Sequence, residues 1–283
     1  MRRQVELCAT SGVAGLAVLG LATEAAKLTL PEKIALVEWT AEDLAGRLPL
    51  GVTLSGSSVA EQVELLRAAE RNGASWVILQ PPMVGVYPPA EYLTFFGRVA
   101  DATHLPVAIQ NAPAYMGRGL SAAEIADLVA RHANVRLLKG EMSAVDIERV
   151  IAHTEGRIRV FNGRGGLELI DNLRAGVEGF VLAPDIADHA AIAVDLFQRT
   201  APAEASARYE RILPAVTFAM QSLESLVCYG KRVFAARAGL QVHDRGPGLR
   251  PTPFGLDLVA RHAEALGAYP AGGGPLDLPR ASP

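Results

Sequence analysis

Lys139 is the residue in this chain whose type and context best suit it to chemistry. It ends the short apolar run at residues 135–139, directly before Gly140 and Glu141. Burial of an amine favours its neutral form, and a neutral amine can attack a ketone to form a Schiff base. The alternative is a lysine whose ammonium group reaches out of the strand end into solvent while its methylene stem stays buried. The rest of the chain favours the reactive interpretation.

Glu141 follows Lys139 by two residues. In an extended segment, side chains two residues apart lie on the same face, so we expect both to point the same way. A carboxylate beside such an amine can serve as a general acid and base. The alternative is a solvated loop carboxylate, or a charge at the N-terminus of the helix predicted after Ser143. The sequence alone leaves both interpretations of Glu141 open.

The elements that must hold these residues alternate between short apolar runs and amphipathic segments. Ser121 and Ser143 stand at helix starts, and Gly73 stands just past a helix end. Such alternation predicts parallel strands with crossover helices, and therefore an α/β fold. The predicted strands are residues 15–19, 48–54, 76–79, 107–110, 135–139, 157–161 and 179–182; the predicted helices include residues 59–72, 89–102, 122–132 and 144–153.

Eight strand–helix units would form a (β/α)8 TIM barrel, and this pattern is one strand short. A helix-like segment at residues 2–9 opens the chain, so we expect the first strand to be missing from this sequence, with a natural start upstream of Met1. An open barrel would leave two unpaired strand edges. Beyond about residue 197 the pattern is only helical. The expected organisation is a barrel domain over residues 1–198, a C-terminal helical region over 199–268, with helices at 205–226, 227–238 and 254–266, and a disordered tail over 269–283.

Composition excludes several classes of protein. The chain has 283 residues, 50% of them hydrophobic, and a formal net charge of −3 with no basic run, which argues against nucleic acid as a main partner. Cys8 and Cys228 read as free thiols, and the six histidines show no metal-ligand spacing. The N-terminus loosely imitates a secretory signal, but Glu6 interrupts it. We expect a cytoplasmic protein with no membrane span, metal or cofactor.

Five places, in order along the chain, resemble the dihydrodipicolinate synthase and N-acetylneuraminate lyase superfamily of Schiff-base lyases. Residues 15–24 resemble its apolar strand and Gly-Thr-Thr-Gly-Glu turn, and residues 28–33 its next helix start. Residues 80–82 (Gln-Pro-Pro) take the slot of its Pro-Tyr-Tyr, and residues 110–113 (Gln-Asn-Ala-Pro) that of its Tyr-Asn-x-Pro. Lys139 takes the position of the Schiff-base lysine. The resemblance covers nearly the whole chain and implies a TIM barrel followed by a small helical region.

The chain departs from the family at the positions of its proton relay. The family's aldolases shuttle protons with the tyrosine of Tyr-Asn-x-Pro, helped by a threonine and a second tyrosine. The matching positions here are Gln110, Leu21 and Met83, and none offers a phenol-type acid or base. The arginine that grips the aldehyde substrate's carboxylate in dihydrodipicolinate synthase falls at Tyr115. A synthase of the lysine pathway is therefore not expected.

The Lys-x-Glu pattern and the Gln-Asn-Ala-Pro segment look more like the 2-keto-3-deoxy sugar-acid dehydratases of the superfamily. That resemblance implies a hydro-lyase in which Lys139 forms an imine with a 2-keto acid and Glu141 serves as base and acid. Gln110 would position a hydroxyl group or a water. Two alternatives stay open: a class I aldolase that releases pyruvate, and a non-catalytic family member that binds a 2-keto acid.

The remaining candidates are predicted to bind the substrate. Backbone N–H groups near Ala22 and Thr23 can hold its carboxylate, as the corresponding turn does in the family. Asn111 belongs to the Tyr-Asn-x-Pro slot. Gly163 lets the backbone approach a ligand, and Arg164 can meet a second anionic or hydroxyl-rich end. In a barrel these strand ends converge on one face. By analogy, the loop at residues 87–89 reaches a neighbouring subunit, so we expect a homotetramer or homodimer.

Overall fold

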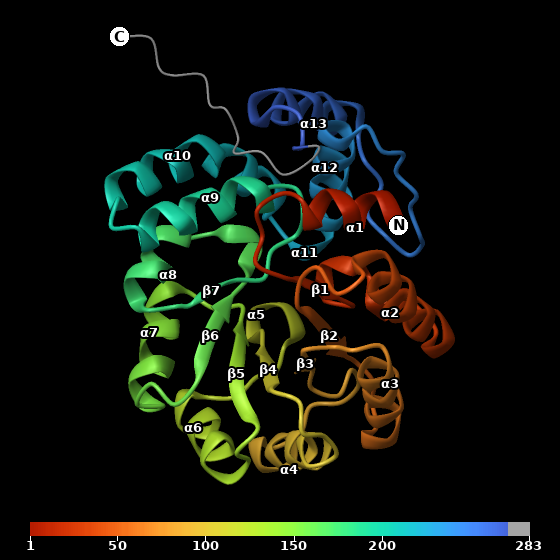
Figure 1. Cartoon of the computed structure of the whole chain (residues 1–283), viewed down its shortest axis with the longest axis vertical. Coiled ribbons are helices and arrows are strands. Elements are labelled where there is room, and N and C mark those ends of the chain that lie inside the picture. The colour runs from red at the N-terminus through yellow and green to blue at the C-terminus, as the bar shows by residue number, and fades with distance from the viewer. Residues whose placement is uncertain (271–283) are drawn as a thin grey trace.

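The computed structural model describes residues 1–270, so most of the tail predicted over 269–283 lies outside the described residues. Within that range a parallel sheet has seven strands in the order β1-β2-β3-β4-β5-β6-β7, with helices outside it (Figure 1). This arrangement confirms the predicted α/β class and fits a TIM barrel. The strands are β1 Leu16–Val18, β2 Leu50–Leu54, β3 Trp76–Leu79, β4 Val107–Asn111, β5 Val135–Gly140, β6 Arg159–Asn162 and β7 Gly179–Phe180.

Helices connect consecutive strands, and polar caps fix where several of them begin. The side chains of Thr29 and Ser121 each accept a backbone N–H three residues on, and Glu32 and Glu124 complete two capping boxes. The helices of the barrel are α1 Arg2–Ala9, α2 Leu30–Leu44, α3 Val59–Arg71, α4 Pro89–Ala100, α5 Pro113–Met116, α6 Ala122–Arg131, α7 Ala144–His153, α8 Leu169–Ala175 and α9 Ala187–Gln198, with short 3-10 turns η1 Leu21–Thr23, η2 Ala25–Lys27 and η3 Arg164–Gly166.

The inside of the barrel is filled by an apolar layer. Ile78, Ala108 and Leu137, from three adjacent strands, pack together with the ring of Trp76 beside them. A Cβ atom on Gly51 would lie 2.6 Å from the Trp76 ring, so only glycine leaves room for this indole. The next inward-facing residues toward the carboxyl ends of these strands are polar. We call that end of the barrel, with the loops that follow the strands, the barrel mouth.

The edge strands differ from the strands in the middle of the sheet. All five residues of β2 and of β4 are buried, whereas the three residues of β1 are only half-buried. In the described residues β1 pairs only with β2, and β7 pairs only with β6. Helix α1 precedes β1, as the sequence predicts. The prediction of a further strand in the complete barrel stays a prediction.

The C-terminal helices break where the sequence did not predict a break. One helix was expected over residues 205–226, but α10 ends at Ala219, and the directions before and after the break differ by 103°. The cause is Ser222, whose side chain accepts the N–H of Ser225 and starts a new helix. The helices are α10 Pro202–Ala219, α11 Leu223–Ser225, the π-helical segment η4 Leu226–Gly230, α12 Lys231–Ala238 and α13 Pro253–Leu266.

The C-terminal helices pack against the first and the last helices of the barrel, α1 and α9. Helix α10 lies along α9, and α13 packs against α12, which lies beside α1 (Figure 1). Leu7 of α1, Phe234 of α12 and Tyr269 form a small apolar cluster there. The boundaries predicted at 198 and 268 stay predictions. Within residues 1–270 no single helix is long and apolar enough to cross a membrane; α10 and residues 223–238 meet the criteria only as a bent pair.

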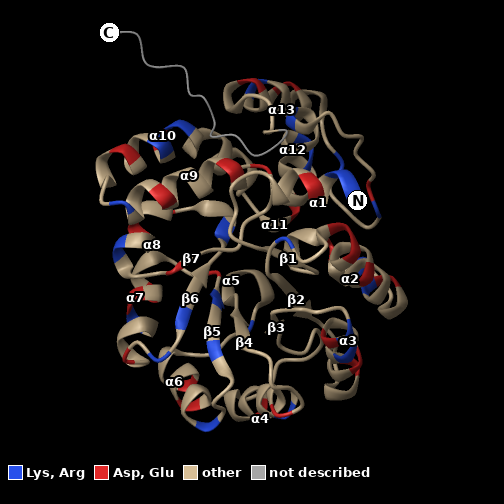
Figure 2. Cartoon of the chain, in the orientation of Figure 1, with Lys and Arg blue, Asp and Glu red and all other residues tan. Residues whose placement is uncertain are grey.

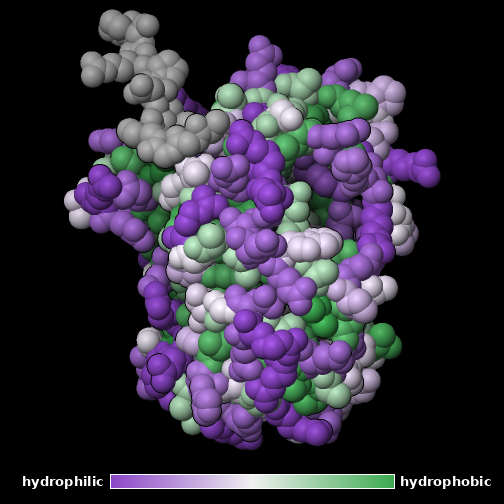
Figure 3. Space-filling view, turned by 45° about the vertical axis from the view of Figure 1, so that its right-hand side comes forward, coloured by the Kyte–Doolittle hydropathy of each residue, from purple (hydrophilic) through white to green (hydrophobic). Residues whose placement is uncertain are grey.

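Charged side chains of both signs are intermixed over the outer helices (Figure 2), and one face of the molecule is largely polar with small, separate apolar groups (Figure 3). This intermixing agrees with the small formal net charge of −3.

Candidate active site

Lys139 is the fifth residue of β5 and faces the inside of the barrel. Leu137, two residues earlier, belongs to the interior apolar layer, and alternate residues of a strand share a face. The side chain of Lys139 is only 5% exposed. This burial excludes the interpretation in which its ammonium group reaches into solvent.

Glu141 lies against Lys139. The Lys139 Nζ donates to Glu141 Oε1 at 2.7 Å, and the Glu141 side chain is 9% exposed. The predicted common orientation is confirmed, and a solvated loop carboxylate is excluded. A buried charge needs such a partner, because desolvation of an unpaired ion costs several kcal/mol. The chemical roles of the two residues stay predictions.

The end of β6 holds the other side of the Glu141 carboxylate. The backbone N–H of Arg164 donates to Glu141 Oε2 at 2.5 Å. A Cβ atom on Gly163 would lie 2.5 Å from Glu141 Oε1, so a larger residue there would displace the carboxylate. Gly163, which was predicted to let the backbone approach a ligand, instead leaves room for the side chain of Glu141. The carboxylate is fixed from two strand ends at once.

Gln110 is the register partner of Lys139 on the neighbouring strand β4. Its Oε1 accepts a hydrogen bond from Gln80 Nε2 at 2.8 Å, and Gln62 on α3 donates to the carbonyl oxygen of Gln80 at 2.9 Å. The Gln110 Nε2 is buried and has no partner within the part of the chain that the structure describes. Gln110 thus presents an amide donor beside Lys139. The sequence analysis named Gln80 only as part of the Gln-Pro-Pro segment that follows the strand predicted at residues 76–79, and gave it no role in the site.

Asn111 is not directed at the site, which corrects its predicted role in substrate binding. Its side-chain amide donates to the carbonyl oxygen of Leu120 at 2.9 Å and accepts the Leu120 N–H at 2.8 Å. Its backbone oxygen accepts the N–H of Glu141 at 3.0 Å. Asn111 therefore holds the loop after β4 in place, because residue 111 faces away from the inward row that contains Gln110.

The turn after β1 has fewer free donors than predicted. The hydroxyl group and the backbone N–H of Thr23 both donate to the carbonyl oxygen of Gly20, at 2.7 and 3.1 Å. The backbone N–H of Ala22 has no hydrogen-bond acceptor among residues 1–270. The backbone N–H of Leu21 likewise has no acceptor among these residues, so this 3-10 turn keeps Leu21 and Ala22 as candidate donors, whereas both donors of Thr23 are occupied.

A cavity of about 460 Å³ leads from the surface to Glu141. Its walls include Tyr115 of α5, Ser143 at the start of α7, Arg149 and Arg164. Arg164 forms an ion pair with Glu168 and is one-quarter exposed. Burial raises the pKa of the Tyr115 hydroxyl, the charge of Glu141 adds to this, and the neighbouring Arg164 opposes it. Tyr115, which takes the position of the arginine expected in a dihydrodipicolinate synthase, therefore lies near Arg164, which comes from the loop after β6.

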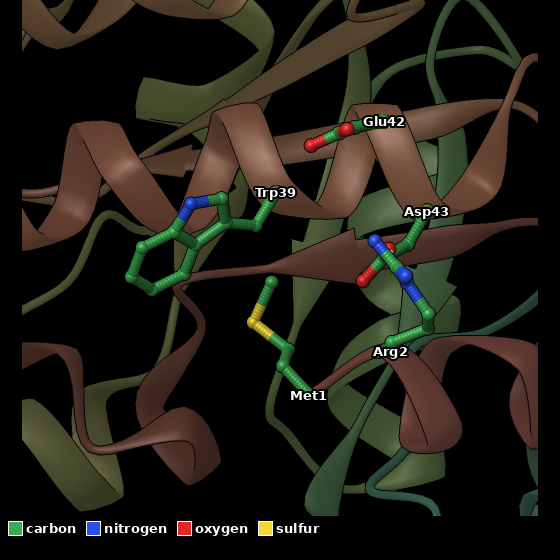
Figure 4. A pocket seen from close by; sticks show the side chains of 5 residues that line it. All are labelled: Met1, Arg2, Trp39, Glu42 and Asp43. Carbon is green, nitrogen blue, oxygen red and sulfur yellow. The ribbon is translucent and has the colours of Figure 1, made fainter.

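A second cavity of about 270 Å³ lies between α1 and α2 and is separate from this site. Met1, Arg2, Trp39, Glu42 and Asp43 line it (Figure 4). Arg2 Nε donates to Asp43 Oδ1 at 2.8 Å. Among the described residues, no three His, Cys, Asp or Glu side chains are grouped so that they could hold a metal ion.

The family of the chain follows from comparison with known proteins. The model of the dihydrodipicolinate synthetase family matches residues 1–221. This chain belongs to the dihydrodipicolinate synthetase family. The resemblance inferred from the sequence is therefore confirmed. Because members of this family are lyases, the protein is assigned to the lyases in general, without a specific reaction.

Named relatives in the family differ in reaction. An L-2-keto-3-deoxyarabonate dehydratase of Azospirillum brasilense is 28% identical over 221 residues, 76% of this chain and 71% of that protein. The putative 2-dehydro-3-deoxy-D-gluconate aldolase YagE of Escherichia coli is 28% identical over 144 residues, 51% of this chain and 48% of that protein. A 4-hydroxy-tetrahydrodipicolinate synthase of Bacillus velezensis is 30% identical over 160 residues, 56% and 55% of the two chains. The chain thus spans about half to 71% of the length of these relatives.

Solved structures match the fold over most of the chain. A putative dihydrodipicolinate synthetase from Pseudomonas aeruginosa superposes with a TM-score of 0.87 at 25% identity, covering 94% of this chain and 91% of that one. YagE in complex with pyruvate gives the same TM-score and coverage at 21% identity. These likenesses support the barrel architecture of the family.

Proposed function

We propose that this protein is a Schiff-base-forming hydro-lyase that dehydrates a 2-keto-3-deoxy sugar acid. The observation that carries the proposal is the buried pair of Lys139 and Glu141 at the barrel mouth, an amine and a carboxylate 2.7 Å apart. The position is the one at which TIM-barrel enzymes hold their catalytic groups. A dehydratase for 2-keto-3-deoxyarabonate is among the relatives.

The reaction begins when a proton passes from Lys139 to Glu141, which leaves a neutral amine. The Nζ attacks the C2 carbonyl of the substrate, and loss of the carbonyl oxygen as water gives an iminium. Glu141, ionised again, removes a proton from C3 to give an enamine. The C4 hydroxyl then leaves with a proton from Glu141, as water. Water finally hydrolyses the imine, which regenerates Lys139, so the net change is the loss of one water molecule.

Glu141 is the group that moves protons in this scheme. Its contact with Lys139 and with the Arg164 N–H fixes both carboxylate oxygens before substrate arrives. General acid–base catalysis by a positioned group contributes about 10²- to 10⁴-fold in rate. Gln110, whose Nε2 has no partner among residues 1–270, positions a substrate hydroxyl or a water but does not transfer protons.

The second candidate function is aldol cleavage. From the same iminium, a base removes the proton of the C4 hydroxyl, the C3–C4 bond breaks, an aldehyde leaves, and the pyruvate enamine is protonated at C3. The relatives YagE and the probable 2-dehydro-3-deoxy-D-pentonate aldolase YjhH favour this alternative. Both candidates depend on the imine at Lys139 and differ only in which bond to C4 breaks.

The deciding experiment combines trapping with product analysis. The protein and a Lys139→Ala variant are incubated with pyruvate and borohydride and then weighed by mass spectrometry. We expect the mass of one reduced pyruvate adduct on the parent and none on the variant. A panel of 2-keto-3-deoxy sugar acids is then assayed for dehydration products and for pyruvate plus aldehyde. Absence of any adduct from pyruvate or a larger 2-keto acid would overturn both enzymatic candidates and favour a 2-keto-acid-binding protein.

We also propose that the chain assembles into a homotetramer or homodimer through the loop between β3 and α4. The side chains of Val84 and Val86 in this loop are 70% and 80% exposed, and Tyr87 follows them. Apolar side chains exposed together favour burial against a partner. Sedimentation velocity of the parent and of Val86→Asp tests this, with dissociation expected for the variant. A parent that sediments as a monomer at micromolar concentration would contradict the proposal.

A further inference from the structure

The cavity that leads to Glu141 is lined by charges of both signs, and each of these charges is paired. Its charged lining residues and their partners form three pairs: Glu141 with Lys139, Asp146 with Arg149, and Arg164 with Glu168. The pairs contribute three positive and three negative charges. Within residues 1–270, therefore, the wall of this cavity has no cation that lacks a carboxylate partner.

Arg164 is the cation of the wall that is tied to the acid–base group. Its backbone N–H donates to Glu141 Oε2 at 2.5 Å, and its side chain, one-quarter exposed, borders the cavity. Its partner Glu168 follows by four residues. Arg164 and Glu168 both have a left-handed backbone, with φ of 51° and 56°, which non-glycine residues keep only where the surrounding structure requires that geometry. The turn after β6 thus brings Arg164 to the cavity together with its own counter-ion.

Arg149 is the other cation of the wall, and it lies largely in water. Its side chain is 65% exposed, and its guanidinium group donates to Asp146 Oδ1 at 3.1 Å. The other carboxylate oxygen of Asp146 accepts the hydroxyl of Ser143 at 2.7 Å. Water screens an ion pair that is this exposed, so Arg149 adds little to the binding of a charged ligand. The response of the cavity to a charged ligand therefore depends mainly on Arg164.

A neutral hydroxyl group suits this wall better than an anion does. Carboxylate oxygens accept several hydrogen bonds and a guanidinium group has five N–H donors, so a hydroxyl can bind to the pair of Arg164 and Glu168 without separating it. Tyr115, which neighbours Arg164, adds a hydroxyl that both donates and accepts. An anion, in contrast, would have to displace Glu168 or remain beside its like charge, which is unfavourable.

A substrate held through C2 at Lys139 has this cavity available for its far end, because the cavity reaches the carboxylate that Lys139 contacts. We propose that the pair of Arg164 and Glu168 makes the active site specific for 2-keto acids whose far end is uncharged and carries hydroxyl groups, and that it rejects those with a second carboxylate. This inference rests on the proposed function for the imine at Lys139. Of the two ends that the sequence left open for Arg164, anionic or hydroxyl-rich, Glu168 thus favours the second.

The test compares two ligands that share the reactive 2-keto acid: 2-oxoglutarate, whose far end is a carboxylate, and its 5-methyl ester, whose far end is uncharged. Titration calorimetry measures their binding to the parent, to Glu168→Gln and to the double variant that adds Arg164→Gln. We expect the parent to bind the ester more tightly. Because Glu168→Gln leaves the charge of Arg164 without its partner, the affinity for 2-oxoglutarate relative to the ester should rise about three- to tenfold. The added Arg164→Gln should abolish this rise.

Asp171→Asn is the matched control. It also removes one negative charge, but Asp171 pairs with Arg174 on α8, is 62% exposed and does not line the cavity. The ratio of the two affinities should change less than about twofold in this control. A parent that binds 2-oxoglutarate at least as tightly as the ester would overturn the proposed specificity. So would a ratio in Glu168→Gln equal to that of the control, or a rise that persists without Arg164.

Borohydride trapping with pyruvate is run separately, so that failure of this specificity and failure of the proposed function can be told apart. A pyruvate adduct on a parent that does not bind the ester would overturn the neutral far end and leave the imine chemistry in place. The expected change of the affinity ratio without any trapped adduct would uphold the role of Arg164 and Glu168 and reject the imine.

Discussion

This protein has two buried pairs of a basic and an acidic side chain that differ in their surroundings. Lys139 and Glu141 pair at the barrel mouth through one contact of 2.7 Å. Arg237 of α12 and Asp188 of α9 pair where the C-terminal helices meet the barrel, and both side chains are fully buried. Each pair removes two opposite charges from water, which offsets the cost of burying either one alone.

The pairs differ in how many donors remain free. Arg237 places two N–H groups on the Asp188 carboxylate, at 3.0 and 2.5 Å, and its other donors reach the carbonyl oxygens of Asp185 and Gly267. Lys139 donates to Glu141 and has no other protein acceptor among residues 1–270. A saturated pair holds helices together, whereas an unsaturated one keeps a nitrogen lone pair accessible once its proton moves to the partner. The comparison predicts that Lys139 takes part in the reaction and that Arg237 contributes to the stability of the fold.

Replacing Lys139 by arginine should have the largest effect on chemistry. A guanidinium group keeps the positive charge and the contact with Glu141 but forms no imine. We expect loss of all borohydride-trapped adduct and of all turnover, while the free energy of unfolding falls by no more than about 3 kcal/mol, the usual cost of overpacking. Mass spectrometry and urea unfolding measure the two. An adduct that persists in Lys139→Arg would assign the nucleophile to another amine.

Glu141→Gln should separate imine formation from the later steps. The amide keeps an acceptor for Lys139 but has no titratable proton, so we expect the pyruvate adduct to form while turnover falls by about 10²- to 10⁴-fold. Glu178→Gln is the control, because that carboxylate pairs with Arg159 and is partly exposed outside the site. Turnover of Glu141→Gln equal to that of the control would remove Glu141 from the mechanism.

Arg237→Met should act on stability alone. It leaves the Asp188 carboxylate buried without its partner, so the free energy of unfolding should fall by about 3–5 kcal/mol. Adding Asp188→Leu should restore much of the loss, because the uncompensated charge is then gone. Urea unfolding gives both values, and the trapped adduct per folded molecule should equal that of the parent. A folded Arg237→Met protein that no longer forms the adduct would show that the two pairs are not independent.

Asp185→Asn should change how stability depends on pH. Burial raises the pKa of Asp185 to about 7 and lowers the pKa of His189 to about 4. The folded protein thus keeps a proton on Asp185 that the unfolded chain releases near pH 4, and this stabilisation is lost as the pH rises to 7. His189 acts oppositely: the unfolded chain takes up a proton below about pH 6.5, so its stabilisation is lost as the pH falls toward 4.

The two contributions oppose each other between pH 4 and 6.5, so the parent should show little change in that range. In Asp185→Asn only the His189 contribution remains, and the free energy of unfolding should rise with pH by about 1 kcal/mol per unit. Urea unfolding at pH 4.5, 5.5 and 6.5 measures the slope. Parallel slopes for the parent and the variant would contradict the assigned pKa directions.

Local patterns were sufficient for most of the helices and strands and for the common orientation of Lys139 and Glu141. The apolar runs and cap residues predicted the strands and most barrel helices, because periodicity and capping are properties of neighbouring residues. The two-residue spacing placed Lys139 and Glu141 on one face for the same reason. The break at Ser222 was missed because helical periodicity continues across it, and a serine interrupts a helix only when its side chain caps the next one.

Local sequence patterns could not predict the contacts that residues make with other strands and loops. Asn111 serves the loop at Leu120, and Gly163 makes room for Glu141, although the sequence assigned both to the substrate. Nothing local distinguishes an asparagine that binds a ligand from one that binds a backbone. That the buried hydroxyl groups of Thr53 and Ser55 lack hydrogen-bond partners among residues 1–270 likewise follows only from the folded structure.

The sequence by itself determined the alternation of strands and helices, the family, and the lysine with its glutamate two residues later. These features depend on residue type and on spacing along one segment, which a single chain displays directly. The tertiary structure alone decided which donors are saturated, which face inward without a partner, and which carboxylate the amine touches. Those properties depend on register and packing between segments far apart in the chain, which no local pattern specifies.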